Sequence, residues 1–200
     1  MKICIDPGHS GPFEPGACAG GVTEAAVTLE IAKITARMLE KYRHKVLLTR
    51  TGDVDNNWLT WRCEAAWNFE ADIFISIHCN AHASTEAHGT EVYYYPGSEN
   101  GHALARCIQE ELVALCRTVD RGVKTDDEWT VLLETACPAV LVELAFLTND
   151  NEREMLTTGM GQRRFAEGLV KGINRFADGG PLFGKVMESA AAYEVRKTET

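Results

Sequence analysis

Apolar residues along residues 1–177 recur in two patterns, which alternate along the chain. Short runs of Ile, Val and Leu predict buried strands, whereas apolar residues three and four positions apart predict helices that bury one face. We expect strands over residues 2–6, 46–49, 72–78, 90–95, 131–133 and 139–143, and helices over residues 24–42, 58–69, 103–117, 151–156 and 163–176. Residues 90–95 alternate around Val92 and Tyr94, which is typical of an edge or half-exposed strand.

Strands that alternate with helices define the expected fold class. They predict a single α/β domain with a mostly parallel, twisted central sheet of about six strands and helices on both faces. Residues 1–177 are expected to form this domain. Residues 178–200 include Gly179-Gly180-Pro181, which ends the last helix, and then become polar with little periodicity. We therefore expect a polar C-terminal tail or linker there.

Composition and charge narrow the classes of function. A net charge of −9 argues against binding to nucleic acid, whose partners are basic. No apolar run approaches the ~18 residues of a membrane span. The first residues have a strand pattern rather than that of a signal peptide, so we expect synthesis in the cytoplasm unless a leader was removed. The seven cysteines include no CxxC pair and are expected to be reduced.

Two histidines and two glutamates near the ends of predicted elements form the candidate site. His9, His78 and Glu143 follow or end predicted strands, and Glu24 lies in the first turn of the first predicted helix. Strand ends are where ligands bind in open α/β sheets. Two histidines, one carboxylate ligand and a second carboxylate recur in hydrolytic zinc sites. These residues therefore predict a metal site, without deciding which glutamate binds the metal.

Each of the four residues also has an ordinary explanation when it is taken alone. His9 could be a loop histidine, and Glu24 a charge that favours a helix N-terminus. His78 could be a core histidine, and Glu143 the ion-pair partner of Arg62 or of another cation. A carboxylate at the end of a buried strand is costly unless it is paired, metal-bound or near water, so Glu143 is the least ordinary. The HExxH, GxSxG and Walker A motifs of other enzyme classes are absent.

A set of motifs from Lys2 to about Phe176 has the order and spacing of one enzyme family. They are Asp6-Pro7-Gly8-His9, Gly16-Ala17, Gly21 with Glu24, Leu48-Thr49-Arg50, Leu59 with Arg62, residues 71–78, Asn80-Ala81, Gly89 with residues 91–94, residues 121–124, 138–143 and 146–149. On these motifs the chain resembles the zinc-dependent N-acetylmuramoyl-L-alanine amidases of the Amidase_3 family, which cut bacterial peptidoglycan.

The resemblance implies a role for each candidate residue. It implies that His9, Glu24 and His78 bind one zinc ion per chain and that Glu143 is the catalytic glutamate. The expected reaction is hydrolysis of the amide bond between the lactyl group of N-acetylmuramic acid and L-alanine, in peptidoglycan or muropeptides. Asn80 and Arg62 are further candidates, which would orient a ligand or contact substrate. The alternative is a non-catalytic peptidoglycan-binding or regulatory module on the same fold.

The chain departs from the family pattern at a few positions. Leu133 stands where an arginine is expected, and the loop from Pro12 to Pro15 differs from the usual acidic loop. These changes bear on substrate specificity rather than on the metal site. The expected setting is a phage or prophage endolysin released by a holin, ahead of a sporulation amidase or an autolysin that has lost its leader. No pattern in the sequence indicates an oligomeric state.

Overall fold

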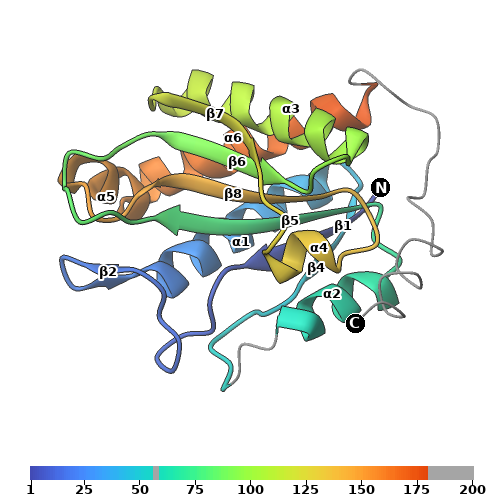
Figure 1. Cartoon of the computed structure of the whole chain (residues 1–200), viewed down its shortest axis with the longest axis horizontal. Coiled ribbons are helices and arrows are strands. Elements are labelled where there is room, and N and C mark those ends of the chain that lie inside the picture. Colours follow the sequence, from blue (N-terminus) through green and yellow to red (C-terminus); the bar gives the residue numbers. More distant parts are fainter. Residues whose placement is uncertain (56–58, 180–200) are drawn as a thin grey trace.

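A six-stranded sheet lies between two layers of helices in the computed structural model, which describes residues 1–55 and 59–179 (Figure 1). In the sheet the strands follow the order β4-β1-β5-β8-β6-β7. The first four are parallel, whereas β6 runs antiparallel to β8 and parallel to β7. The predicted α/β class with a mostly parallel sheet is confirmed. The strand bounds are β1 Lys2–Pro7, β4 Lys45–Leu48, β5 Ile73–Asn80, β6 Thr90–Tyr94, β7 Asp120–Thr125 and β8 Ala139–Phe146.

Helices cover both faces of the sheet, as predicted. The helix bounds are α1 Glu24–Lys41, α2 Leu59–Asn68, α3 Glu99–Cys116, α4 Thr130–Leu133, α5 Asp150–Thr157 and α6 Gly159–Ala177. Helices α1, α3 and α6 pack on one face, and the smaller α2 and α4 pack on the other. A short hairpin of β2 (Cys18–Ala19) and β3 (Val22–Thr23) leads into α1. The Thr23 side chain accepts a hydrogen bond from the Ala26 N–H, which caps α1 where the sequence predicts its start.

The larger core lies between the sheet and the layer of α1, α3 and α6. Successive side chains of a strand point to opposite faces. Along β8, Val140 and Val142 therefore enter the larger core, whereas Leu141 enters a smaller cluster under α2 and α4. Glu143 shares the face of Leu141 because it lies two residues further on. The face that carries α2 and α4 is thus also the face that receives polar residues near the strand ends.

One strand prediction is wrong. Residues 131–133 form helix α4 rather than a strand, since the Leu132 and Leu133 amides both donate to the Trp129 carbonyl. A three-residue apolar run carries no periodicity that separates strand from helix. Residues 90–95 form a strand as predicted; of the two expected positions, edge or half-exposed, β6 is the half-exposed one, since it lies between β8 and β7 and only its last two residues are partly exposed. Strand β7 escapes prediction because it is mostly polar and contains Gly122.

The remaining predicted elements form close to their expected bounds, and α3 and α6 each begin four residues earlier than predicted. Trp58 and residues 180–200 of the predicted tail lie outside the described residues. The seven cysteines all lie within the described residues and are not joined by disulfides there. Among the described residues, no helix combines the length and apolar character needed to cross a membrane.

Candidate metal centre

His9 lies two residues beyond β1 in a tight turn. Its φ of +64° belongs to the left-handed region, which is uncommon for a residue with a side chain. Two buried guanidinium groups hold this turn by its carbonyl oxygens. Arg62 donates to the carbonyls of Pro7 at 2.9 Å and His9 at 2.6 Å, and Arg50 donates to those of Pro7 at 3.0 Å and Gly8 at 2.8 Å. The surrounding structure therefore fixes the strained turn and aims the imidazole.

Glu24 is the first residue of α1, as the sequence predicts, and its side chain is buried. The backbone amides of Ala17 and Cys79 donate to its carboxylate oxygens at 2.9 and 3.0 Å. One amide comes from the loop before the β2–β3 hairpin and the other from β5. Segments distant in sequence thus fix both oxygens of this carboxylate.

His78 completes a group of three side chains. His9 Nε2 lies 2.9 Å from Glu24 Oε2, and His78 Nδ1 lies 2.9 Å from Glu24 Oε1. One nitrogen or oxygen from each residue falls within 4.8 Å of the other two. Two imidazoles and one carboxylate are the donors that catalytic zinc sites use. The arrangement and chemistry of this group therefore fit a divalent metal ion, and the structure brings together the three residues that the sequence singled out.

Two glycines permit this close approach. A Cβ at Gly8 would lie 2.5 Å from Cε1 of His78, and a Cβ at Gly16 would lie 2.4 Å from Cδ2 of His9. Both distances are well inside van der Waals contact, so the two imidazoles occupy the space that side chains at these positions would need. Gly16 also has a φ of +69°, which favours glycine for a second reason.

The charges of the group reinforce one another. Burial raises the pKa of Glu24, but hydrogen bonds with His78 and His9 outweigh it and hold that pKa below its usual range. Burial lowers the pKa of His9, while Glu24 and Glu14 raise it, with a net shift upward. Glu24 is therefore ionised at neutral pH, and its negative charge faces both imidazoles.

Glu14 belongs to this site, although the sequence analysis did not single it out. His9 Nδ1 lies 2.5 Å from Glu14 Oε1, on the side of the ring away from Glu24. The loop places Glu14 there because the Ser10 amide donates to the Glu14 carbonyl and the Glu14 amide donates to the Gly11 carbonyl. A carboxylate on the second ring nitrogen of a metal-binding histidine fixes its tautomer and orientation. Only the fold of the loop brings these residues together, so the sequence carries no periodic signal for it.

Glu143 lies beside the three-residue group in the sheet. Its Cα pairs with that of His78 on β5 and with that of Glu91 on β6. Oxygen Oε2 is shielded from solvent and has no hydrogen-bond partner among the described residues. Burial, with Glu24 and Glu91 nearby, raises the pKa of Glu143 well above its usual range. A carboxyl group held in this way is a candidate for proton transfer.

Asn80 and Arg62 both lie close to the site but differ in role. Asn80 donates from Nδ2 to Glu91 Oε1 at 2.7 Å, so it contacts the neighbour of Glu143 rather than the group of three. Arg62 is buried and donates to Asp6 as well as to the His9 turn. It supports the backbone of His9 and pairs with Asp6, rather than serving as the ion-pair partner of Glu143.

The chain matches known proteins along most of its length. A family model described as N-acetylmuramoyl-L-alanine amidase, Amidase_3, matches residues 3–175. N-acetylmuramoyl-L-alanine amidase CwlM of Bacillus licheniformis is 39% identical over 199 residues, which cover 98% of this chain and 74% of that protein. The crystal structure of an N-acetylmuramoyl-L-alanine amidase from Clostridium difficile 630 is 33% identical, with a TM-score of 0.83 over 88% of this chain and 96% of that one. The catalytic domain of CwlV from Bacillus (Paenibacillus) polymyxa var. colistinus is 30% identical, with a TM-score of 0.82 over 88% and 98% of the two chains.

Proposed function

Because the chain belongs to the Amidase_3 family of N-acetylmuramoyl-L-alanine amidases, we propose that it hydrolyses bacterial peptidoglycan in a zinc-dependent reaction. The bond cut is the amide between the lactyl group of N-acetylmuramic acid and the L-alanine of the stem peptide. The observation that carries the proposal is the convergence of His9, Glu24 and His78 within 4.8 Å, beside the unpartnered Oε2 of Glu143.

In this proposal His9, Glu24 and His78 hold one zinc ion per chain. When bound, the metal supplies Lewis acidity, which polarises a carbonyl group and makes water a better nucleophile near neutral pH. The protein contributes a preformed group of donors. Backbone amides of Ala17 and Cys79 orient the Glu24 carboxylate, and Glu14 orients the His9 ring.

Glu143 carries the proton transfers in this proposal. It accepts the proton of the water that attacks the lactyl carbonyl, and then donates it to the nitrogen of L-alanine as the amide bond breaks. General acid–base catalysis is efficient when the pKa of the group is close to the working pH, and burial moves the pKa of Glu143 upward from its usual acidic value. The products are a glycan strand with a free lactyl carboxylate and a stem peptide with a free amino terminus.

Chelation of the metal tests the proposed function. We expect purified chain to release stem peptides from peptidoglycan, to lose this activity after chelation and to regain it when zinc is added. Mass spectrometry of the products should show new L-alanine amino termini and unsubstituted glycan. If the chain binds one equivalent of zinc but cleaves no type of wall, the alternative of a non-catalytic peptidoglycan-binding or regulatory module would replace the amidase proposal.

Replacement of Glu14 should weaken zinc binding. Glu14→Ala removes the carboxylate that holds Nδ1 of His9, and loss of such a partner typically costs about 10- to 100-fold in metal affinity. Competition with a chromophoric chelator measures the zinc dissociation constant directly, without reference to turnover. Glu30→Gln is a matched control, because Glu30 is exposed on α1 and pairs with the surface residue Lys33. Equal zinc affinity in Glu14→Ala and wild type would contradict this role.

The proposed setting is the bacterial cell wall, where the chain acts as a phage or prophage endolysin or as an autolysin. Production in a bacterial host with and without a holin distinguishes the two routes, because only an endolysin depends on the membrane lesion to reach the wall.

A further inference from the structure

A row of ionisable residues crosses the sheet from the candidate metal centre to its far edge. His78 on β5 pairs with Glu143 on β8, and Glu143 pairs with Glu91 on β6. Paired residues of neighbouring strands project from the same face. The row therefore continues from the metal centre across two strands, on the face that carries α2 and α4, and reaches β7.

An irregularity in β7 brings two cations to the end of this row. Thr90 pairs with Asp120 and Val92 pairs with Val123, so Glu91 faces two residues, Arg121 and Gly122. Residues three apart on a regular strand point to opposite faces. Because β7 has one extra residue between these pairs, Arg121 and Lys124 lie on the same face of the sheet. Both side chains therefore reach Oε2 of Glu91.

Glu91 is a buried anchor for these cations. Its side chain is 3% exposed, whereas those of Arg121 and Lys124 are 35% and 38% exposed. Tyr93 and Asn80 donate to its other oxygen, Oε1. Burial raises the pKa of Glu91, but hydrogen bonds from Lys124 and Arg121 lower it by more. The net result is a pKa below the usual value, so the carboxylate is ionised.

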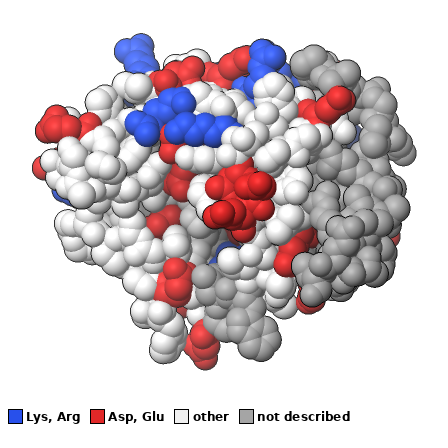
Figure 2. All heavy atoms as spheres, in the orientation of Figure 1, with Lys and Arg blue, Asp and Glu red and all other residues white. Residues whose placement is uncertain are grey.

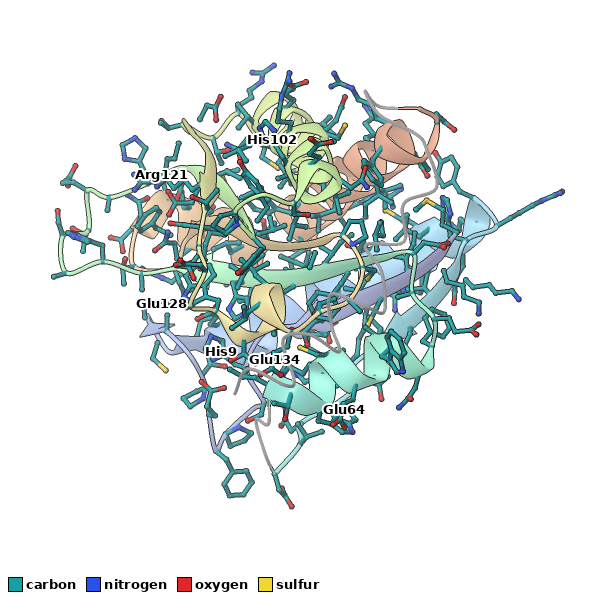
Figure 3. All side chains as sticks on the ribbon, turned by 45° about the vertical axis from the view of Figure 1, so that its right-hand side comes forward. His9, Glu64, His102, Arg121, Glu128 and Glu134 are labelled. Atoms are coloured by element: carbon teal, nitrogen blue, oxygen red, sulfur yellow. The ribbon has the colours of Figure 1, made fainter. Side chains whose placement is uncertain are left out.

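Arg121 and Lys124 keep positive charge and hydrogen-bond donors that Glu91 does not use. Two cations share one carboxylate, which leaves one positive charge in excess. Arg121 uses Nε for Glu91, and its Nη1 reaches the His88 carbonyl only at 3.4 Å. Among the described residues, Arg121 Nη2 donates to no acceptor, and Lys124 Nζ donates only to Glu91. Figure 2 shows basic side chains gathered over β7 on this face, and in Figure 3 Arg121 lies above His9 in the view.

The proposed substrate carries an anion at a matching distance from the bond that is cut. L-alanine is followed in the stem peptide by D-glutamate joined through its γ-carboxyl group, so the α-carboxylate is free unless it is amidated. From Glu143 to β7 is two strand spacings, or roughly 10 Å. Two residues of extended peptide span about 7 Å, and the long side chains of Arg121 and Lys124 cover the remaining distance.

We propose that Arg121 and Lys124, held in place by Glu91, form a subsite that binds the α-carboxylate of the second stem-peptide residue. This inference rests on the proposed amidase function, since it takes the stem peptide as ligand. The subsite orients the peptide so that the alanine amide lies at Glu143. It also makes the enzyme sensitive to amidation of that carboxylate, which is a chemical difference between bacterial walls.

Binding of two released stem peptides tests the subsite independently of turnover. The probes are L-Ala-γ-D-Glu-L-Lys and the same tripeptide with the α-carboxylate amidated, titrated calorimetrically into the wild-type chain. We expect the free acid to bind roughly fivefold to tenfold more tightly than the amide. The ratio should fall towards one in Lys124→Gln and Arg121→Gln, persist in Lys124→Arg, and shrink as ionic strength rises.

Controls separate this role from a structural one. Each single substitution leaves one cation paired with Glu91, and thermal melting verifies that the variant is folded. If Arg121→Gln does not fold, Lys124→Gln still provides the test, because the side chain of Lys124 is the more exposed of the two. Arg106→Gln on α3 removes an exposed arginine that pairs with Glu110, and should not change the ratio.

Several outcomes would overturn the subsite: equal binding of acid and amide by the wild type, no binding of either, or an unchanged ratio in both charge-removing variants. Carboxylate-dependent binding without any cleavage of muropeptides would instead remove the proposed amidase function and leave the subsite standing.

Discussion

Glu143→Gln should abolish most turnover while zinc stays bound. Glutamine has nearly the same shape but cannot accept the proton of the attacking water, and a positioned general base contributes about 10²- to 10⁴-fold to the rate. Because Oε2 of Glu143 has no hydrogen-bond partner among the described residues, the substitution breaks no hydrogen bond of that oxygen. The variant should therefore fold normally and lose kcat.

Two measurements on the same preparation check this prediction. Release of stem peptide from muropeptides gives kcat, and elemental analysis of the dialysed protein gives the zinc content per chain. Glu128→Gln is a suitable control, because Glu128 is an exposed carboxylate in the segment that precedes α4. If Glu143→Gln loses zinc together with turnover, Glu143 belongs among the metal ligands and the proposed division of roles is incorrect.

Asp6→Ala should destabilise the whole domain. Asp6 is 1% exposed and accepts hydrogen bonds from Thr49, Ser76 and the buried guanidinium of Arg62. Removal of one partner from a buried ion pair leaves the other charge without compensation, which costs about 3–5 kcal/mol in the free energy of unfolding. For a domain of this size the melting temperature should fall by roughly 10 °C.

Denaturant unfolding of Asp6→Ala, Arg62→Ala and the double variant measures the coupling of the pair. The double variant should lose less stability than the sum of the two single variants, because it leaves no unpaired charge. Asp72→Ala is a control, since Asp72 is exposed and accepts from the Lys2 amide at the start of β1. A loss below about 1 kcal/mol for Asp6→Ala would place the Asp6–Arg62 pair in the range of an exposed pair.

The zinc affinity of Asp6→Ala should also fall, because Arg62 holds the carbonyl of His9.

The candidate metal ligands could be predicted because local pattern sets their positions. His9 and His78 follow or end apolar strand runs, and Glu24 follows the capping residue Thr23. Such runs specify where an element ends, and parallel strands bring their ends to one edge of a sheet. Strand β7 and helix α4 could not be predicted in the same way. The first is mostly polar with an irregular register, and the second is too short to show a period.

By itself, the sequence determined the α/β class and the order of most elements, and it singled out the four residues proposed for the reaction centre, because these follow from periodicity and from motifs with fixed spacing. Only the tertiary structure decided that Glu14 supports His9, that Arg62 pairs with Asp6, and that Arg121 and Lys124 share Glu91. The physical reason is the range of the interactions. Hydrophobic periodicity acts over a few residues, whereas an ion pair or a hydrogen bond joins any two groups that the folded chain brings within about 3 Å.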